Sequence, residues 1–427
     1  MDHVITTSLE LEPAQIHVVV GHGKELVIDE FADIANGSSL TFVTQKEQLG
    51  TGDAVNHALP NIPANANVLM LTADVPLIQT NTLRQLVESM QSHTLTVLTA
   101  IVENPFGLGR ITRDESQAVS GIVEEKDASA EQKRITEINS GIICARKSRL
   151  SDWLSQVGNN NNQQEYYLTD VVEIAYKAGD PITTLQPHEN DEVNGINDRV
   201  QLAAAERIYQ QRLAAQLMRD GVTIIDPSRI DIRGLVSIGA DTIVDVNCVI
   251  EGKTQIGNNV QIGPNCHIIN SEIADGVQIY ANTVIENAVV GARSHLGPFA
   301  RLRPGSKLAD GVKIGNFVET KNAQLSFGTK VNHLSYVGDA KVGENTNIGA
   351  GVITCNYDGA NKHKTEIGKD VFVGSDCQLI APVKIEDGAT VGAGSTITSN
   401  VAEGVLAISR GKQREIKGWQ RPVKKNK

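Results

Sequence analysis

A six-residue repeat of aliphatic side chains runs from Ile238 to Ile397 and constrains the fold more than any other feature. A period of six fits neither an α-helix, with 3.6 residues per turn, nor an ordinary strand, with a period of 2. It is typical of a parallel β-helix, in which each repeat forms one short strand and three repeats form a coil. No repeat buries its apolar face alone, so the coils are expected to stack. The repeated positions are Ile238, Val244, Ile250, Ile256, Ile262, Ile268, Ile273, Ile279, Ile285, Val290, Leu296, Leu302, Leu308, Ile314, Val342, Ile348, Ile367, Val373, Leu379, Ile385, Val391 and Ile397.

Two stretches interrupt the six-residue phase, residues 316–336 and residues 354–365. Insertions in a solenoid usually form functional loops on one face, so both stretches are predicted to be such loops. His333 lies in the first stretch, beside basic residues. Histidine is the side chain whose ordinary pKa suits a general base near neutral pH, so His333 is a candidate base, with a surface histidine as the alternative. His267 and His295 lie in regular repeats and are interpreted as surface histidines.

Basic side chains also gather near the first interruption. Arg301 and Arg303 lie in the motif FARLRPG, and Lys321 follows. Arginine suits bidentate contact with phosphate oxygens, so this cluster is a candidate phosphate site. The alternative for each residue is a solvated surface charge. Of the two arginines, the motif favours Arg303 as the ligand.

Residues 1–198 alternate helical and strand patterns, which is typical of an open α/β sheet that binds ligands at the carboxyl ends of its strands. The apolar run from Asn67 to Leu71 predicts a central parallel strand. Asp74 follows it, and a carboxylate there is either a metal ligand or a turn residue. The segment from Gln45 to Gly52 places amides and glycines at a strand-to-helix turn, which fits either contact with a flat polar ring or an ordinary helix N-terminus. Residues 199–222 have helical spacing and predict a linker helix.

The charge and the cysteines exclude several classes of function. The 427 residues carry a net charge of -11, which would repel nucleic acid and anionic membranes. No apolar run approaches the roughly 18 residues of a membrane helix, and no secretory signal is present, so a cytoplasmic protein is predicted. The odd number of widely spaced cysteines indicates free thiols rather than disulfides or a zinc site. These cysteines are Cys144, Cys248, Cys266, Cys355 and Cys377.

Several motifs together resemble one family. TQKEQLGTGDA, LTADVPL, FGLGRI, GIVEEKDA, EINSGI, QEYYLTD and GINDRVQLA are similar to the uridylyltransferase domain of the bifunctional UDP-N-acetylglucosamine pyrophosphorylase/glucosamine-1-phosphate N-acetyltransferases. The hexapeptide half resembles the second domain of the same enzymes. The resemblance implies a Rossmann-like α/β domain over residues 1–198, a linker helix over 199–222 and a left-handed parallel β-helix over 223–427.

The resemblance also implies an activity and a set of site residues. The family acetylates glucosamine-1-phosphate with acetyl-CoA and then transfers uridylyl from UTP, with Mg²⁺, to make UDP-N-acetylglucosamine for bacterial cell-wall and lipopolysaccharide synthesis. It works as a homotrimer whose acetyltransferase site lies between subunits. The implied contacts with UTP and the sugar nucleotide are Gln45, Gly50, Thr51, Gly109, Glu124, Asn139 and Asn197, with Asp74 and Asn197 as metal ligands. The implied base is His333, and the implied glucosamine-1-phosphate ligands are Arg303, Lys321, Tyr336, Asn347 and Lys362. The implied acetyl-CoA contacts are Ala350, Asn356, Tyr357, Ser375, Ala393 and Arg410.

One departure from the family leads to an alternative. The family begins with a strand and a glycine-rich loop of pattern L-x-A-G-x-G-T-R-M, followed by a Pro-Lys, and this segment is not found here. Nucleotidyl transfer depends on positioning and charge neutralisation, so a truncated first domain is expected to have little or no uridylyltransferase activity. The alternative hypothesis is therefore an acetyltransferase alone. A third hypothesis, a non-enzymatic β-solenoid scaffold, predicts no convergence of His, Arg and Lys.

Overall fold

The boundary between two units of the chain falls inside the helix α8 (Arg199–Arg219). The computed structural model describes residues 1–37 and 39–424, and its units are Met1–Ile208 and Tyr209–Lys427. Each unit is described by itself below. In the described part of the chain, no helix combines the length and the apolar character needed to cross a membrane.

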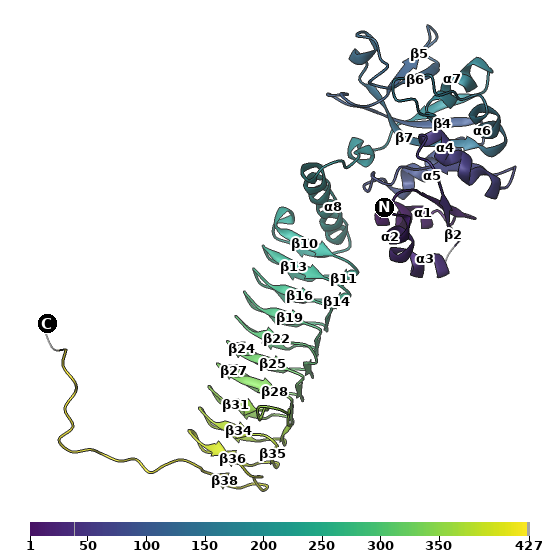
Figure 1. Cartoon of the computed structure of the whole chain (residues 1–427). Coiled ribbons are helices and arrows are strands. Elements are labelled where there is room, and N and C mark those ends of the chain that lie inside the picture. Colours follow the sequence, from purple (N-terminus) through teal and green to yellow (C-terminus); the bar gives the residue numbers. More distant parts are fainter. Residues whose placement is uncertain (38, 425–427) are drawn as a thin grey trace. The chain divides into compact units, whose positions relative to one another are not determined.

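The first unit alternates helices and strands, as its sequence pattern predicts (Figure 1). Its helices are α1 (Asp2–Leu9), α2 (Lys24–Glu30), α3 (Ala32–Gly37), α4 (Thr51–Ala58), α5 (Thr80–Ser89), α6 (Lys147–Leu154) and α7 (Asp170–Lys177). Its strands are β1 (Ile16–Val20), β2 (Leu40–Thr44), β3 (Asn67–Met70), β4 (Leu95–Ile101), β5 (Arg110–Arg113), β6 (Val119–Val123), β7 (Glu137–Arg146) and β8 (Ile182–Leu185).

These strands form two sheets rather than one. β1 and β2 pair in parallel with each other, and the larger sheet has the order β6-β5-β7-β4-β8 with β3 beside β7. The prediction of a central parallel strand over Asn67–Leu71 is wrong, because β3 runs antiparallel to β7. An apolar run reports burial, and burial alone does not determine the direction of the neighbouring strand.

Helices cover both faces of the larger sheet. On one face, α6 and α7 bury side chains such as Trp153 and Val171 against Leu95 and Ile143. On the other, α5 packs Leu83 and Leu86 against the sheet. β5 and β6 form an antiparallel hairpin, and β5 also pairs with β7.

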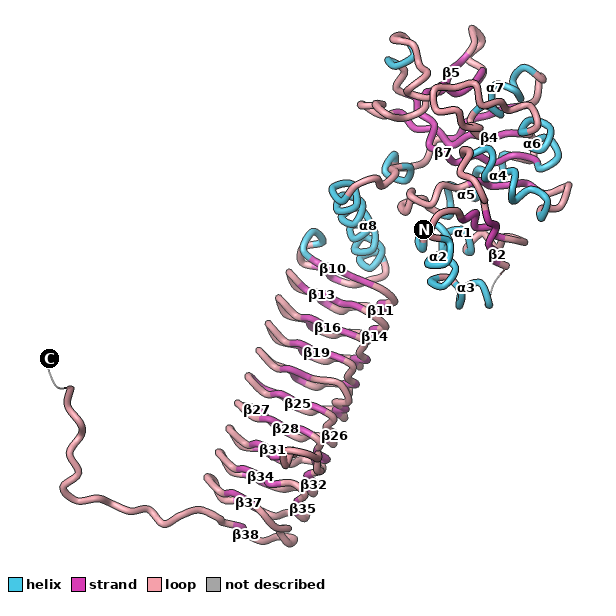
Figure 2. Tube along the Cα trace, viewed as in Figure 1, coloured by secondary structure: helices cyan, strands magenta, loops and turns pink. Residues whose placement is uncertain are grey.

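The second unit is a parallel β-helix with three flat faces (Figure 2). The first face is β9 (Thr223–Ile224), β12 (Ile243–Val244), β15 (Gln261–Ile262), β18 (Gln278–Ile279), β21 (His295–Leu296), β24 (Lys313–Asn316), β27 (Lys330–His333), β30 (Asn347–Ile348), β33 (Phe372–Val373), β36 (Thr390–Val391) and β38 (Leu406–Ala407). The second face is β10 (Ile230–Arg233), β13 (Cys248–Glu251), β16 (His267–Ile269), β19 (Val284–Glu286), β22 (Arg301–Leu302), β25 (Glu319–Lys321), β28 (Tyr336–Gly338), β31 (Ile353–Cys355), β34 (Gln378–Ile380) and β37 (Thr396–Ile397). The third face is β11 (Val236–Ile238), β14 (Thr254–Ile256), β17 (Glu272–Ile273), β20 (Val289–Val290), β23 (Lys307–Leu308), β26 (Gln324–Leu325), β29 (Ala340–Val342), β32 (Thr365–Ile367) and β35 (Val383–Ile385).

The predicted aliphatic positions form the interior of this prism. Ile250, Ile268, Ile285 and Leu302 stand in register on the second face and are fully buried. Inward residues six positions apart in the sequence therefore lie on successive faces. Every third strand lies on the same face and stacks on the strand one coil earlier. The β-helix prediction is confirmed.

The two interruptions have different origins. Residues 316–336 are not a loop, because β25, β26 and β27 continue the coil through them. There the inward position of the second face is taken by Thr320, which is fully buried and bonds through its hydroxyl to Ser306 Oγ at 2.9 Å. The six-residue pattern of aliphatic side chains is interrupted in the sequence because the inward residue Thr320 is polar. The second interruption is confirmed as an insertion, a hairpin between β31 and β32.

The C-terminal half of α8 belongs to the β-helix. Ala214 is fully buried in the core of the prism, and Leu213 and Leu217 pack against that core. The Gln210 side-chain amide exchanges two hydrogen bonds, of 2.7 and 2.8 Å, with the backbone of Ile232 in β10. The helix thus covers apolar side chains of the first coils as well as connecting two segments.

Candidate functional sites

One edge of the second face, where it meets the first face, is called here the first corner. His333, Ala350, Ser375 and Ala393 lie there in successive coils, each two residues after an inward residue of the first face. The residue that follows Ala350, Ser375 or Ala393 in the chain donates its N–H to the carbonyl of the corner residue one coil earlier. The three donor–acceptor distances are 3.4, 2.7 and 2.8 Å. Below His333 the corner is therefore a column of small side chains, along which a thin, extended ligand has room to lie.

His333 ends β27 with its ring exposed to solvent. Its Nδ1 lies 3.0 Å from Oδ1 of Asn316, the residue in register with it one coil earlier. An amide oxygen only accepts hydrogen bonds, so this contact places the ring proton on Nδ1 and the lone pair on Nε2. That tautomer suits a general base. Sequence reasoning did not single out Asn316; its place one coil before His333 was the available signal.

The opposite edge of the second face, where it meets the third face, is called here the second corner. Lys321 ends β25 there, Arg303 follows β22 one coil earlier, and Lys362 belongs to the inserted hairpin. Lys362 lies against Lys321 and lowers the pKa of the Lys321 ammonium, with smaller contributions from burial and from Arg303. Ammonium groups held this close repel one another, so the cluster is a candidate site for an anion.

Neighbouring groups orient this cationic cluster. Glu319 accepts a hydrogen bond of 2.7 Å from Arg303 and raises the pKa of its guanidinium. The Tyr336 side chain lies along β28 over Gly338, where an added Cβ would come within 2.3 Å of the phenol oxygen. Asn356 donates to that oxygen at 3.4 Å. The second corner thus also presents a phenol and an amide.

The structure does not bring all the predicted ligands together. His333 and the column of small residues lie at the first corner, whereas the cations lie at the second corner, with the width of the second face between them. Asn347 lies on the first face in β30. Arg410 donates a hydrogen bond to the Ala393 carbonyl, and the Tyr357 ring is 60% exposed. In one chain, the candidate base and the candidate phosphate ligands are separate groups.

In the first unit, Asp74 and Asn197 meet around Gly195. A Cβ added to Gly195 would lie 3.3 Å from an Asp74 carboxylate oxygen and 4.0 Å from the Asn197 amide nitrogen. The Ile196 N–H donates to the Asp74 carbonyl at 3.0 Å, which fixes the two segments together. Both side chains are exposed. Within residues 1–37 and 39–424 no cluster of three or more His, Cys, Asp or Glu side chains could hold a metal alone.

Gln45, Gly50 and Thr51, which the resemblance implies as contacts with UTP, lie in one turn. Gln45 follows β2, and its amide donates to the Gly50 carbonyl at 3.2 Å and to Asp53 at 2.8 Å. Gly50 has φ of +116°, and a Cβ there would lie 2.6 Å from the Tyr166 carbonyl oxygen, so only glycine fits. The Thr51 hydroxyl accepts the Leu168 N–H at 3.0 Å. The turn is thereby held against residues 166–168.

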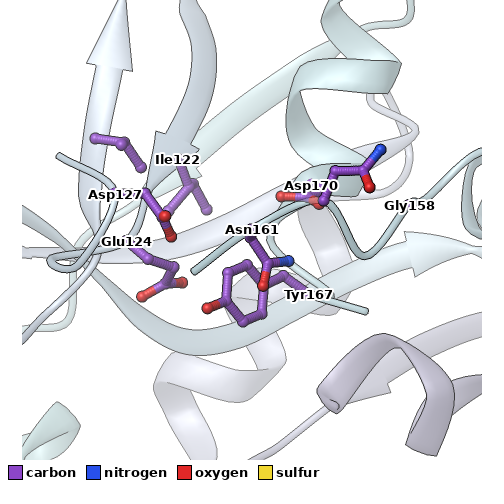
Figure 3. Close-up of a pocket in the computed structure, with 9 residues that line it drawn as sticks. Ile122, Glu124, Asp127, Gly158, Asn161, Tyr167 and Asp170 are labelled. Carbon is purple, nitrogen blue, oxygen red and sulfur yellow. The ribbon is translucent and has the colours of Figure 1, made fainter. Parts of the chain in front are cut away.

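Glu124 lines an acidic pocket of about 400 Å³, shown in Figure 3. Burial raises the pKa of the Glu124 carboxyl, and the Asp127 charge raises it further, while a hydrogen bond from Thr169 acts in the opposite sense. Gly109 lies beside Glu124, since an added Cβ would come within 3.3 Å of both carboxylate oxygens. Asn139 of β7 contacts the residue that precedes β5, because its N–H donates to the Gly109 carbonyl at 2.9 Å.

Sequence reasoning missed three residues of this pocket, Asp127, Tyr167 and Asp170. Burial raises the pKa of Asp170 to about 6 and that of Tyr167 to about 12. The pocket therefore presents two carboxyls, Glu124 and Asp170, that burial disfavours as anions. The signal in the sequence was the motif QEYYLTD, which contains both Tyr167 and Asp170.

Comparisons with known proteins cover both units. Family models match as the MobA-like NTP transferase domain (residues 1–135), the GMPPB C-terminal domain (residues 232–316) and the bacterial transferase hexapeptide with six repeats (residues 364–399). The "Bifunctional protein GlmU" of Marinobacter nauticus is 52% identical over 424 residues, covering 99% of this chain and 92% of that protein. The protein of the same name from Stutzerimonas stutzeri is 52% identical over 425 residues, with 100% and 93% coverage. A solved UDP-glucose pyrophosphorylase complexed with UDP-glucose has a TM-score of 0.38 and 15% identity over 49% of this chain and 86% of that one.

Proposed function

The chain belongs to the family of the bifunctional protein GlmU and is a bifunctional enzyme of UDP-N-acetylglucosamine synthesis; we propose here how its residues divide the two reactions. A Rossmann-like nucleotidyltransferase domain is joined to a left-handed β-helix of hexapeptide repeats. The proposed limits are residues 1–198 for uridylyl transfer, 199–222 for the linker helix and 223–427 for acetyl transfer. The observation that carries the proposal is the pair of corners, one with a candidate base and the other with a cluster of cationic side chains.

In acetyl transfer, His333 is the proposed general base. The glucosamine nitrogen attacks the thioester carbon of acetyl-CoA, the carbon–sulfur bond breaks, and CoA leaves as the thiol after taking up a proton. His333 Nε2 removes the proton that the amine nitrogen must lose, and Asn316 keeps the lone pair on that atom. No covalent intermediate on the protein is needed.

The cationic cluster is the proposed binding site for the phosphate of glucosamine-1-phosphate. Arg303, Lys321 and Lys362 would neutralise its charge, and relief of the Lys321–Lys362 repulsion favours binding of an anion. Tyr336 and Asn347 are proposed to contact the sugar.

Acetyl-CoA is proposed to lie along the first corner. The small side chains of Ala350, Ser375 and Ala393 leave room for the pantetheine arm, and Arg410 would face a phosphate of CoA. Asn356 and Tyr357 complete the proposed set. Because the base and the cationic cluster lie at different corners of one chain, we propose a homotrimer in which a neighbouring copy completes each site.

In uridylyl transfer, Asp74 and Asn197 are the proposed ligands of Mg²⁺. A carboxylate and an amide oxygen fit this ion, which prefers oxygen ligands and keeps waters and substrate phosphates as its others. When bound, Mg²⁺ would neutralise charge on the reacting phosphates. Gln45, Gly50 and Thr51 are proposed to contact uracil. Gly109, Glu124, Asn139 and Asn197 are proposed to contact the sugar nucleotide.

Separate assays of the two half-reactions test this division. Asp74→Asn is expected to abolish uridylyl transfer and to leave acetyl transfer within about twofold of the unaltered protein, because the two sites lie in different units. Lys321→Ala is expected to have the opposite effect. Loss of both activities in either variant would contradict two independent sites.

An acetyltransferase alone is not favoured, because 52% identity to the bifunctional relatives extends over 99% of this chain and includes the first domain. The scaffold hypothesis is disfavoured by the convergence of basic side chains at the second corner. We also propose a cytoplasmic location, free thiols and no nucleic-acid or membrane partner. All five cysteines are unpaired in the structure.

A further inference from the structure

The hairpin inserted between β31 and β32 carries three of the proposed ligands, Asn356, Tyr357 and Lys362. It spans residues 356–363, and Tyr357 and Lys362 face each other across it in an isolated antiparallel bridge. The Asp358 N–H donates to the Asn361 carbonyl at 3.1 Å. Asn356, at its base, donates to Asp339 at 2.5 Å. The position of Lys362 therefore depends on how firmly this hairpin is closed.

Asp358 and His363 close the hairpin. One oxygen of the Asp358 carboxylate accepts the N–H groups of Ala360 and Asn361 at 2.8 and 2.7 Å. The other oxygen lies 2.7 Å from Nε2 of His363, and the His363 N–H donates to the Asn356 carbonyl at 2.8 Å. The Asn361 N–H, followed by the His363 ring, holds the pKa of Asp358 well below its usual range. Asp358 is therefore ionised at any pH at which the enzyme would work.

This closure acts against a repulsion. Lys362 is held beside Lys321, and the two ammonium groups would separate if the hairpin were loose. The charged groups around the hairpin are Asp358, Lys362 and Lys364 within or next to it, Lys321 with Arg303 on the neighbouring coils, and Asp339 beside its base. Of the side chains that the structure describes, Asp358 is the acid in contact with the His363 ring.

We propose that Asp358 and His363 are positioning residues for phosphate binding, which hold Lys362 beside Lys321 before the substrate arrives, and that protonation of His363 tightens this hold. The proposal rests on the proposed acetyltransferase function. A protonated imidazole forms an ion pair with Asp358, whereas a neutral imidazole forms only a hydrogen bond. The hold is therefore expected to be tighter when the His363 ring carries a proton than when it is neutral.

The test compares steady-state kinetics of the full-length protein and His363→Phe at two pH values. At about pH 6, KM for glucosamine-1-phosphate is expected to rise about fivefold with kcat within about twofold, the scale of one exposed ion pair. At about pH 8.5 the ratio of the two KM values is expected to fall to about twofold, since only the neutral hydrogen bond is then lost. Both proteins are assayed with the same substrate, so titration of the substrate changes both KM values equally and cancels in their ratio. His363→Gln, which keeps a donor without a charge, is expected to give a KM close to that of the unaltered protein at the higher pH.

A matched control is available on a regular coil. His267 pairs with Glu251 through Nε2 at 3.0 Å, four coils from β28, and carries no proposed role. His267→Phe is expected to leave KM unchanged at both pH values. An equal rise in both variants, or a ratio for His363→Phe that does not vary with pH, would overturn the proposal.

Hydrogen exchange without substrate gives a readout independent of activity. The amides of Ala360 and Asn361 are expected to exchange faster in His363→Phe than in the unaltered protein, and unchanged exchange would overturn the closure by His363. If the unaltered protein failed to acetylate glucosamine-1-phosphate, the proposed function would fail, while the exchange experiment would still decide whether His363 closes the hairpin.

Discussion

Replacing Asp170 by asparagine is expected to stabilise the first unit at about pH 8 and to have little effect at about pH 4. Asp170 begins α7 and lines the acidic pocket with Glu124 and Asp127 (Figure 3). Burial, followed by the charges of Glu173 and Glu124, raises the pKa of Asp170 to about 6 from its ordinary value of 3.8. Asparagine has nearly the same shape and no charge, so it removes the repulsion without changing the packing.

The sign follows from proton linkage. A carboxyl whose pKa is higher in the folded chain binds its proton more tightly there, so this stabilisation is present at low pH and is lost as the pH rises from about 4 to about 6. The shift corresponds to about 3 kcal/mol, at about 1.4 kcal/mol per pKa unit. Asp170 is partly exposed, and solvent screening reduces this to about 1–2 kcal/mol. The N-terminus of α7 stabilises the ionised Asp170 carboxylate by about 0.3–1 kcal/mol, because the helix dipole favours a negative charge. This offsets part of the free-energy cost of burying that charge.

Urea unfolding followed by tryptophan fluorescence measures this effect. Trp153 is 1% exposed in the first unit, whereas Trp419 is 66% exposed in the second, so the emission change reports mainly on the first unit. Asp170→Asn is expected to raise the free energy of unfolding by about 1 kcal/mol at about pH 8. Asp152→Asn, which removes an acid that is 63% exposed, serves as a control and is expected to stay within about 0.5 kcal/mol. A loss of stability in Asp170→Asn at about pH 8 would show that the helix dipole outweighs burial and refute the reasoning.

Three further substitutions test the sites. His333→Ala is expected to lower the acetyl-transfer kcat by about two orders of magnitude, the scale of a positioned base, whereas His295→Ala should leave it unchanged; near-normal turnover would remove His333 from that role. Gly338→Ala is expected to displace the Tyr336 phenol, since the new Cβ would lie 2.3 Å from its oxygen, and to raise KM for glucosamine-1-phosphate; an unchanged KM would show that this phenol does not contact the sugar. Gly50→Ala is expected to destabilise the first unit by more than about 1 kcal/mol and to lower uridylyl transfer, because φ is +116° there; thermal unfolding that matches the unaltered protein would contradict this.

The β-helix was predictable because its signal is local and repetitive. A residue such as Ile268 points inward because it comes six positions after Ile262, whatever lies elsewhere in the chain. The one failure of this reasoning was residues 316–336, where the pattern broke but the fold did not. Thr320 is buried there with its hydroxyl bonded to Ser306, and pairing with a side chain one coil earlier leaves no trace in the sequence.

The sequence predicted which residues belong to the candidate sites, but not where these residues lie relative to one another. Motifs and their resemblance to a family identified His333, Lys321 and Lys362, but the sequence does not show that Lys362 lies against Lys321 while His333 lies at another corner. Such distances depend on how many residues each coil contains and on where the hairpin folds back.

The sequence by itself determined that the chain contains a stacked β-helix and an α/β domain, because periodicity dictates which side chains must be buried. Only the tertiary structure decided the antiparallel direction of β3, the tautomer that Asn316 imposes on His333, and the acidic pocket around Asp170. Each of these depends on contacts between segments that are distant in the chain. Periodicity carries no information about such contacts, because it reports which face of a segment is buried and not which partner covers it.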